Sequence, residues 1–300
     1  MTNSDNTYAM FLELRGFDVL HCDSIDWFVY QNFLMPAYFP HKVPKITNTQ
    51  ARLALKKTRC PFVRWDSNFN EGKDMPWWYI LKQGLWDIKD VKNGKKRWMI
   101  RQGIKNFSVR VLDHTEIATL CWPVAQAAVS RYKGSKNVEG KNDFANILQT
   151  LDAFPDKIEF LGCFADDKLV SFAENWLDGD AVWIYSIRHD PEHLKKYSSY
   201  ALLNGLLTHY LNEKKAKYVF DGCRNIHHVT QFQDYLIKVF NFEKIDSKLN
   251  IEYSKWFNPF VCIASPFSPV FNYAYKKTHS NFFLNVHAVL NQHDIFKKCK

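Results

Sequence analysis

The clearest hydrophobic pattern in the chain lies in its second half, where turns separate three short apolar runs. These runs cover residues 158–164, 168–177 and 181–187, with Asp166-Asp167 between the first two and Asp178-Gly179-Asp180 between the last two. Aspartate and glycine between apolar runs are typical of tight hairpin turns. The pattern therefore predicts a three-stranded antiparallel meander.

Two helices and two further strands are expected after the meander. The first helix is indicated by apolar residues at three- and four-residue spacing, namely Ala201, Leu202, Leu203, Leu206, Leu207, Tyr210 and Leu211. The apolar run 218–220 ends at an Asp221-Gly222 turn, a second amphipathic helix reaches about Phe240, and a last strand is expected over residues 244–253. The order β-β-β-α-β-α-β predicts a mixed α/β (α+β) fold, in which antiparallel strands lead into a β-α-β crossover.

The first half shows weaker patterns. Long regular elements are not expected before Cys60, because prolines interrupt this part of the chain at Pro36, Pro40 and Pro44, and Pro61 follows directly. Basic and apolar residues alternate over residues 95–105 and predict an amphipathic helix. Residues 107–112 then alternate like a strand.

A capping signature and a polar segment follow this strand. Asp113 and Glu116 stand where the reciprocal cap of a helix would, before an apolar stretch that reaches Val129. Residues 133–141 are polar and contain two glycines, which is typical of a loop or linker. The sequence therefore predicts a helix here and a break before the meander.

Composition and charge narrow the class of protein without selecting a partner. Of the 300 residues, 46% are hydrophobic and 24% are charged, which is typical of a globular protein that buries a core. The formal net charge is +9, so the surface is expected to attract anions such as phosphorylated cofactors, nucleic acid or anionic lipid. A solvated basic surface with no dedicated partner is the alternative.

The cysteines indicate a reducing compartment. The seven are scattered and no two have C-x-x-C spacing, so neither a zinc site nor a disulfide framework is expected. His227 and His228 are adjacent, and adjacent helical positions point about 100° apart, so we expect no metal site there. A cytoplasmic location fits this use of cysteine best.

The sequence has neither the pattern of a membrane span nor that of a secretion signal. No uninterrupted apolar run approaches the roughly 18 residues of a spanning helix, and prolines break the apolar segment 257–271. The N-terminus lacks a basic region followed by an apolar core. At most, we expect association with a membrane surface. Residues 266–300 are expected to form a packing helix or the interface of a homo-oligomer.

Candidate chemistry lies where the third strand of the meander runs into a helix. A helix start presents free backbone N–H groups and a positive dipole end, which suit phosphate. Lysines in a first turn oppose that dipole, so an anionic ligand would relieve an electrostatic cost. A capped helix with a basic first turn is the alternative. The expected ligand contacts are Ile187, Arg188, Lys195, Lys196, Ser198, Ser199 and Tyr200.

The strand order, this junction and the terminal segment 238–242 resemble the GNAT acyltransferase superfamily, whose members bind acyl-CoA at such a junction. The segment 97–110 and the turn Asp221-Gly222-Cys223-Arg224 are similar to the Fem-type and related branch associated with bacterial surface polysaccharides. In that branch a degenerate copy of the fold precedes the standard one. The resemblance implies an acceptor-side half over residues 1–150, a donor-binding half over 151–256 and a helical extension over 257–300.

The chain departs from the superfamily pattern at two places. The usual phosphate loop carries Arg/Gln-x-x-Gly-x-Gly, whereas Tyr197 and Ser199 stand where glycines would fall here. Many acetyltransferases place a tyrosine four residues before the glycine of a terminal Gly-Phe, as the acid for the leaving thiolate. Ile237 occupies that position, and Tyr235 lies nearby but off register.

Acyl transfer to an amine needs a held carbonyl, a deprotonated amine and a proton donor for the leaving group. The catalytic candidates are Asp221, Glu174 and Tyr235. Asp221 ends a strand after the crossover, where α/β folds gather ligands, although a turn-forming role is equally expected. Glu174 is more often expected to be a solvated strand residue. Arg224, Asn225 and Trp78 are the candidates for binding the acceptor, and the aromatic run around Trp78 is more often core.

Three functions remain open on the sequence. The leading hypothesis is an N-acyltransferase that uses acyl-CoA or acetyl-CoA and no metal, by direct attack of an amine, such as that of an amino sugar in a surface glycan. The second is a Fem-type transferase that uses aminoacyl-tRNA. The third is a non-catalytic nucleic-acid-binding protein, which the dispersed basic residues disfavour.

Overall fold

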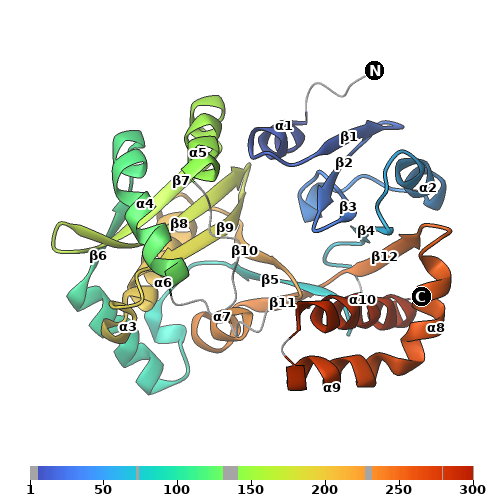
Figure 1. The fold of residues 1–300 in the computed structure, drawn as a ribbon. Helices are drawn as coiled ribbons and strands as arrows, with labels where there is room; N and C mark the ends of the chain where they lie inside the picture. The colour runs from blue at the N-terminus through green and yellow to red at the C-terminus, as the bar shows by residue number, and fades with distance from the viewer. Residues whose placement is uncertain (1–5, 72–73, 131–140, 227–231, 279, 300) are drawn as a thin grey trace. The chain divides into compact units, whose positions relative to one another are not determined.

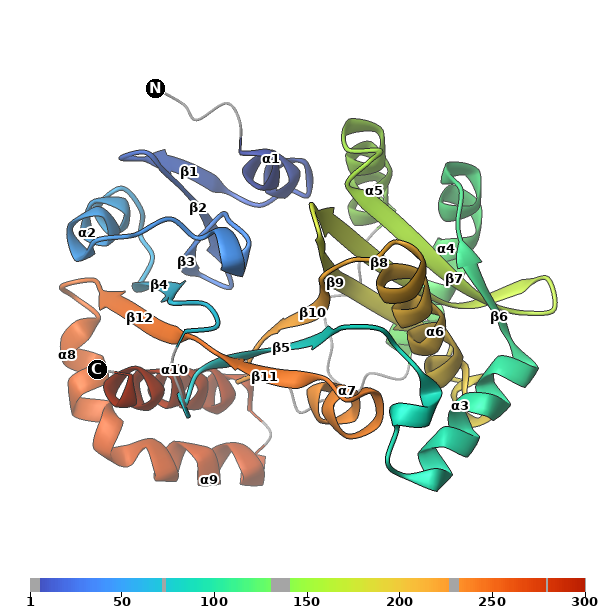
Figure 2. The same ribbon diagram turned by 180° about the vertical axis from the view of Figure 1, so that it is seen from behind.

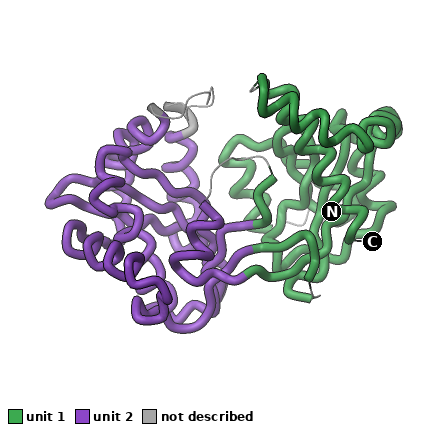
Figure 3. Tube along the Cα trace, turned by 90° about the horizontal axis from the view of Figure 1, so that it is seen from below, with its two compact units in different colours: residues 1–79, 223–230, 244–300 green, residues 80–222, 231–243 purple. Residues whose placement is uncertain are grey.

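The computed structural model describes residues 6–71, 74–130, 141–226, 232–278 and 280–299, and it contains two compact units (Figure 3). Unit 1 comprises Met1–Tyr79, Cys223–Thr230 and Lys244–Lys300, and unit 2 comprises Ile80–Gly222 and Gln231–Glu243. The chain therefore passes between the units several times. The predicted linker over residues 133–141 and the pair His227-His228 lie outside the described residues or at their edge.

Unit 1 is built on a five-stranded sheet in the order β1-β2-β3-β4-β12. The strands are β1 (Val19–Cys22), β2 (Ile25–Tyr30), β3 (Phe33–Pro36), β4 (Phe62–Ser67) and β12 (Lys248–Tyr253). The helices before β4 are α1 (Thr7–Leu14) and α2 (Asn48–Lys56). These elements are short, as the prolines predicted.

Successive side chains of β4 point to opposite faces of this sheet. Val63 and Trp65 belong to the core that includes Leu55 of α2. Phe62 packs instead with Ile295 of the C-terminal helix. The sheet of unit 1 is thus covered by a helix on each face.

The last helices of unit 1 form a separate layer. They are α8 (Asn258–Ala264), the short 3₁₀ turn η5 (Ser265–Phe267), α9 (Ser268–Thr278) and α10 (Asn281–Lys298). Figure 1 shows α9 running beside α10, and the two helices are in contact. The predicted packing helix is confirmed as α10, which buries Val286, Leu290 and Ile295.

Unit 2 contains most of a seven-stranded sheet in the order β11-β5-β10-β9-β8-β7-β6. In sequence order the strands are β5 (Trp78–Gln83), β6 (Ser108–Val111), β7 (Ile158–Ala165), β8 (Lys168–Asp178), β9 (Ala181–His189), β10 (Tyr218–Cys223) and β11 (Glu243–Asp246). β7, β8 and β9 form the predicted antiparallel meander, and β9 pairs with β10 in parallel. The fold is therefore mixed α/β, as expected.

Helices cover both faces of this sheet. They are α3 (Gly94–Asn106), α4 (His114–Ser130), α5 (Lys141–Ala153), α6 (Ser198–Leu207), which continues into a π-helical turn (Thr208–Glu213), and α7 (Phe232–Phe240). α4 packs on β8 and β9, whereas α6 is the crossover helix and packs on β6, β7 and β8. The predicted cap of α4 is present, because Glu116 N donates to Asp113 Oδ1 at 2.8 Å and Asp113 N donates to Glu116 Oε2 at 3.1 Å.

The single strand predicted over residues 244–253 is wrong. The chain divides at Ser247 into β11, which joins the sheet of unit 2, and β12, which pairs with β4 in unit 1 (Figure 2). The Ser247 amide donates to Trp77 O at 3.1 Å, and its hydroxyl donates to Ser67 O at 3.1 Å. The expected halves 1–150 and 151–256, with the extension 257–300, describe two copies of one fold, whereas the two units are defined by their compactness. This division stays a prediction.

Candidate functional site

A β-bulge in β9 bends this strand near the middle of the sheet. Glu174 of β8 pairs with Ser186, but the next residue, Asn175, pairs with Ile184. Tyr185 is thus the extra residue of the bulge. Such a bulge bends its strand and increases the local twist.

Beyond the bulge, β9 and β10 no longer pair. The ladder between them ends at Trp183↔Phe220, whose rings stack with centroids 6.0 Å apart, although β9 continues to His189 and β10 to Cys223. We call residues 184–189 and 221–222 the splayed strand ends. Backbone groups of β9 here lie at the carboxyl end of parallel strands, where α/β folds bind ligands.

A short loop connects the splayed end of β9 to α6, and Asp190 holds it in place. The Asp190 amide donates to Val170 O at 2.8 Å, and its carboxylate accepts a hydrogen bond from the Glu192 amide at 3.0 Å. His193 Nδ1 lies 3.2 Å from the same carboxylate. The helix start is therefore positioned by the body of the sheet.

Tyr197 precedes α6 in the left-handed conformation, with φ 72° and ψ 31°. This conformation costs an ordinary L-residue roughly 1–2 kcal/mol and costs glycine little. Aromatic contacts hold the tyrosine there, because its ring lies 5.6 Å from that of Trp98 and 5.8 Å from that of Tyr200. The chain thus forms the backbone geometry that glycine usually supplies, with a bulky side chain in its place.

Helix α3 packs directly against the start of α6, as Figure 2 shows. A Cβ atom on Gly103 would lie 2.7 Å from Tyr197 O and 3.0 Å from Ala201 N, so only glycine permits this approach. Lys96 Nζ donates to the Tyr200 hydroxyl at 3.2 Å. The sequence pattern of residues 95–105 did not predict this position of α3.

The close packing of α3 brings a set of basic residues to this end of α6. Its sequence from Gly94 to Asn106 contains no acidic residue. Asn106 Nδ2 donates to Lys196 O at 3.2 Å and joins α3 to the turn before α6. The basic residues of these two segments are Lys95, Lys96, Arg97, Arg101, Lys105, Lys195 and Lys196.

Side chains of α7 contact both the end of β10 and the start of α6. Gln233 Nε2 donates to Asp221 Oδ2 at 3.4 Å, and burial raises the pKa of Asp221 to about 7. The Tyr235 hydroxyl lies 3.5 Å from Ser199 Oγ, and burial raises the Tyr235 pKa, so the phenol stays protonated. Helix α7 therefore contributes a protonated phenol and also contacts a carboxyl group whose pKa is about 7.

Two of the other predicted residues, Glu174 and Arg188, lie on another face of the sheet. Glu174 is 2% exposed and lies on the face of the sheet that α4 covers, so the expected solvated position is wrong. Arg188 pairs with Phe172 and points to the same face as Glu174, because β8 side chains alternate. Ile187 belongs to the splayed strand ends, and Ser198 is buried in the first turn of α6.

The residues predicted to bind the acceptor lie in unit 1. The Arg224 amide donates to Trp78 O at 2.7 Å, and its guanidinium donates to Pro76 O at 2.7 Å. The ammonium of Lys244 lies 4.6 Å above the Trp78 ring. Asn225 is partly exposed beside Arg224. Trp77 and Tyr79 are core residues, in agreement with the alternative reading of this aromatic run.

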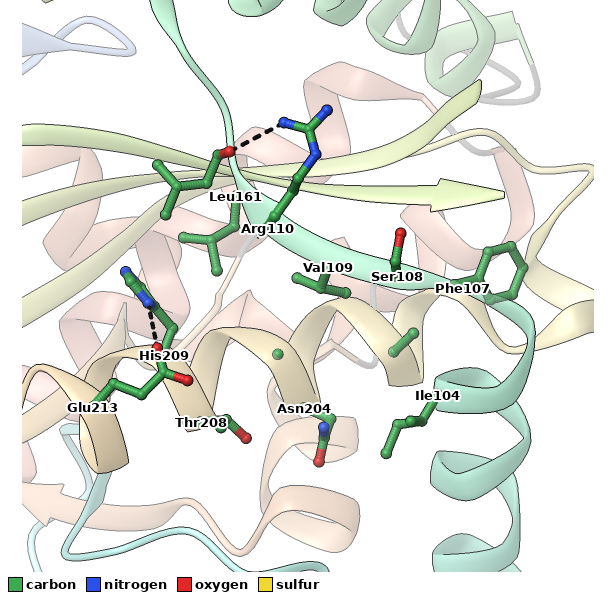
Figure 4. Close-up of a pocket in the computed structure, with 13 residues that line it drawn as sticks. Ile104, Phe107, Ser108, Val109, Arg110, Leu161, Asn204, Thr208, His209 and Glu213 are labelled. Carbon is green, nitrogen blue, oxygen red and sulfur yellow. Dashed lines mark hydrogen bonds and ion pairs between the residues drawn. The ribbon is translucent and has the colours of Figure 1, made fainter. Parts of the chain in front are cut away.

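A separate groove of about 600 Å³ lies between β6 and α6 (Figure 4). Gly205 permits the close approach, because a Cβ there would lie 2.5 Å from Val109 Cγ1. At one end, His209 Nε2 contacts Glu159 at 2.8 Å and Nδ1 contacts Glu213 at 2.9 Å. The lining contains neither Asp221 nor Tyr235.

The described residues contain no group of three or more histidine, cysteine or acidic side chains that could hold a metal ion. Within the same part of the chain, no helix has the length and apolar character needed to cross a bilayer. All seven cysteines are free thiols.

No family model matches the chain, and no curated protein matches its sequence. Solved structures match its fold. A domain described as the C-terminal (DUF2156) domain of a lysylphosphatidylglycerol synthetase from Agrobacterium fabrum matches 85% of this chain over 89% of its own, with a TM-score of 0.55 and 12% identity. FemX matches 85% of this chain over 92% of its own, with a TM-score of 0.53 and 8% identity.

L-PGS from Bacillus licheniformis matches 98% of this chain over 93% of its own, with a TM-score of 0.52 and 12% identity. At such identities the likeness shows the fold alone. The chain thus has the GNAT-like, mixed α/β fold that the sequence predicted.

Proposed function

We propose that this protein is a transferase that moves an acyl group from an activated donor to an amine at the splayed strand ends. The observation that carries the proposal is that side chains of α7 contact both Asp221, through Gln233, and Ser199 at the start of α6, through Tyr235, and that burial raises the pKa of Asp221 and of Tyr235. The likeness of the fold to FemX and to the lysylphosphatidylglycerol synthetase domain supports it.

In this mechanism the donor carbonyl oxygen accepts a hydrogen bond from a backbone amide of β9 that no longer pairs with β10. The amine attacks the carbonyl carbon directly, so that a C–N bond forms as the bond to the leaving group breaks. Asp221 takes the proton that the amine loses. Tyr235 gives its proton to the leaving thiolate or alkoxide.

The donor that we propose is an acyl-CoA. The first turn of α6, with Ser199 and the neighbouring Lys195 and Lys196, supplies backbone N–H groups and positive charge for the pyrophosphate. Tyr197 adopts the left-handed backbone conformation that a glycine would have in the usual phosphate loop. The amine that we propose as acceptor belongs to an amino sugar of a surface glycan. Arg224, Asn225 and Trp78 remain the proposed contacts of that acceptor.

A second donor, charged tRNA, is favoured by one observation. The basic residues of α3 adjoin the basic turn before α6, and together they form a surface suited to a phosphate backbone. Both donors place the acyl carbonyl at the same strand ends. They differ in what binds to the basic residues around it.

A melting series separates these donors, because a ligand that binds only the folded state raises the melting temperature. The protein is heated alone and with coenzyme A, acetyl-CoA or tRNA, each at low and moderate salt. A shift with coenzyme A that survives moderate salt supports the thioester donor. A shift with tRNA alone that survives salt supports the second donor, and no shift with any of them would sink the proposal.

A further inference from the structure

The segment from Trp256 to Tyr273 carries two apolar stripes of the same period. The inner stripe consists of Phe257, Val261, Ala264, Ser268 and Phe271, spaced by four or three residues. Val261 and Ala264 are buried against Val286 and Leu290 of α10. This stripe accounts for the packing of α8 and α9 within unit 1.

The outer stripe is offset by one position, which turns it about 100° away from the inner one. Between 43% and 71% of each side chain in it is exposed. Its first member, Trp256, precedes α8, and the other five follow one another along α8, η5 and α9, which Figure 1 shows in orange and red: Phe260, Ile263, Phe267, Val270 and Tyr273. Single exposed apolar residues are ordinary, but six that follow one another at helical spacing mark an interaction surface.

Only basic charge accompanies the outer stripe. The sequence has no aspartate or glutamate between Glu252 and Asp294. Lys255 stands at one end of the stripe, and Lys276 and Lys277 stand at the other; all three are exposed. Asp294 lies within 3.4 Å of the Ser265 hydroxyl, and Glu252 forms an ion pair with Arg52.

These charges decide whether the outer stripe binds a second copy of the chain or a phospholipid surface. In a symmetric dimer, the stripe would pack against an antiparallel copy of itself, and Lys255 would face Lys276 and Lys277 of the second copy. Like charges would meet without a carboxylate between them. A phospholipid surface offers an apolar layer for the stripe and anionic head groups for the lysines. Trp256 and Tyr273, near the ends of the row, are residue types enriched at membrane interfaces.

We propose that the outer stripe binds the surface of a membrane that contains anionic phospholipid, with α8 and α9 lying in the plane of the interface. The apolar side chains enter the boundary between head groups and acyl chains, and the three lysines contact lipid phosphates. The proposal does not depend on the identity of the acyl donor, because it rests on unit 1 alone.

The test measures binding of the full-length protein to vesicles by sedimentation. Vesicles of phosphatidylcholine alone are compared with vesicles in which about a third of the lipid is phosphatidylglycerol. We expect at least tenfold stronger partitioning to the anionic vesicles. The double variant Ile263→Gln/Phe267→Gln should partition to the anionic vesicles at least tenfold more weakly than the parent. The double variant Lys276→Gln/Lys277→Gln should partition to them several-fold more weakly.

The matched control is Leu85→Gln, which replaces an equally exposed leucine (66%) of unit 2. It should bind vesicles within twofold of the parent, and circular dichroism melting confirms that every variant is folded. Lack of binding to anionic vesicles, or equal binding by the double variant, would overturn the proposal. A concentration-dependent dimer that the double variant abolishes would also overturn it, in favour of a second copy as occupant.

Discussion

Asp221 is partly buried, and its carboxylate accepts a hydrogen bond from Gln233. Desolvation disfavours the carboxylate and raises its pKa to about 7, whereas Tyr235 stays protonated for the same reason. Burial therefore keeps the Tyr235 phenol protonated and sets the loss of the Asp221 proton near pH 7. These two side chains can thus supply a base and an acid near neutral pH.

The Asp221→Asn variant should lose activity and gain stability. A general base contributes about 10²–10⁴-fold to the rate, so transfer should fall by that factor at pH 8. Parent activity should rise with pH through about 7, as the carboxyl group loses its proton. Initial rates across pH 5–9 check both expectations.

The stability change has the opposite sign. The folded-state pKa of Asp221 is raised, so the folded state binds more protons than the unfolded state between about pH 4 and 7, and its ionisation weakens the fold. Asparagine removes that penalty, so the variant should be more stable than the parent at pH 8, by at most about 4 kcal/mol. Equal activity together with lower stability at pH 8 would contradict this role of Asp221.

His209 predicts a second pH effect, in the fold rather than in the reaction. Its pKa is raised by hydrogen bonding to Glu159, so the stabilisation is complete below the ordinary value of 6.5 and is lost as pH rises through the raised value. His209→Gln should remove about 0.5–1 kcal/mol of stability at pH 5.5 and much less at pH 8.5. Urea unfolding of parent and variant at both pH values measures this. A difference that does not change with pH would refute the ion pair.

At the scale of elements, the contact between α3 and α6 adjoins the proposed donor site, and the sequence could not predict this contact. The helical period of residues 95–105 is clear, and α3 has nearly these bounds. The contact joins residues that are far apart in the chain, such as Asn106 and Lys196. Local periodicity contains no information on such a pairing. The one signal in the sequence was Gly103, an unfavourable residue within a helix.

Replacement of Gly103 by alanine should separate these helices. The added methyl group would meet backbone atoms of Tyr197 and Ala201, which cannot move independently of α6. We expect a loss of about 1–3 kcal/mol in stability and weaker donor binding. Gly94→Ala is the control, because its Cβ would meet only the end of the Arg97 side chain, at 3.7 Å. Thermal melting of both variants tests this expectation. Equal melting temperatures would show that α3 does not pack closely against α6.

Other elements were predictable because their signals are local. The meander, the α4 cap and the α6 helix follow from turn residues and period. The prediction of one strand over residues 244–253 was wrong. The alternation of apolar and polar residues continues through Ser247, but the parts before and after it pair with different sheets. Among the site residues, Asp221 and Tyr235 could be proposed from strand ends and resemblance. The buried position of Glu174 could not, because adjacent strands and α4 cover it.

At the scale of the whole molecule, the two sheets exchange neighbouring stretches of chain. β5 precedes the meander by more than seventy residues and still lies between β10 and β11, whereas β12 follows β11 directly and completes the sheet of unit 1. β5 thus follows the first four strands of unit 1 in the chain but pairs in the seven-stranded sheet. β12 follows the strands of the seven-stranded sheet in the chain but pairs in the five-stranded sheet. A sequence-defined half lacks one of these strands.

The fragment 151–256 should therefore not fold by itself. It lacks β5, β6 and α3, which leaves strand edges and the face of α6 uncovered, and β12 has no partner. We expect no cooperative thermal transition by circular dichroism, whereas the full chain should melt cooperatively. A cooperative transition in the fragment would show that the exchanged strands are dispensable.

Hydrogen exchange measured by mass spectrometry, with and without donor, tests the proposed site most directly. Coenzyme A and tRNA are added separately to the full-length protein, and the protection of backbone amides is mapped along the chain. The predicted result is protection of residues 184–189 and 198–201 by one of the two ligands. Protection confined to the groove between β6 and α6, or no protection at the splayed strand ends by either ligand, would contradict the proposed donor site.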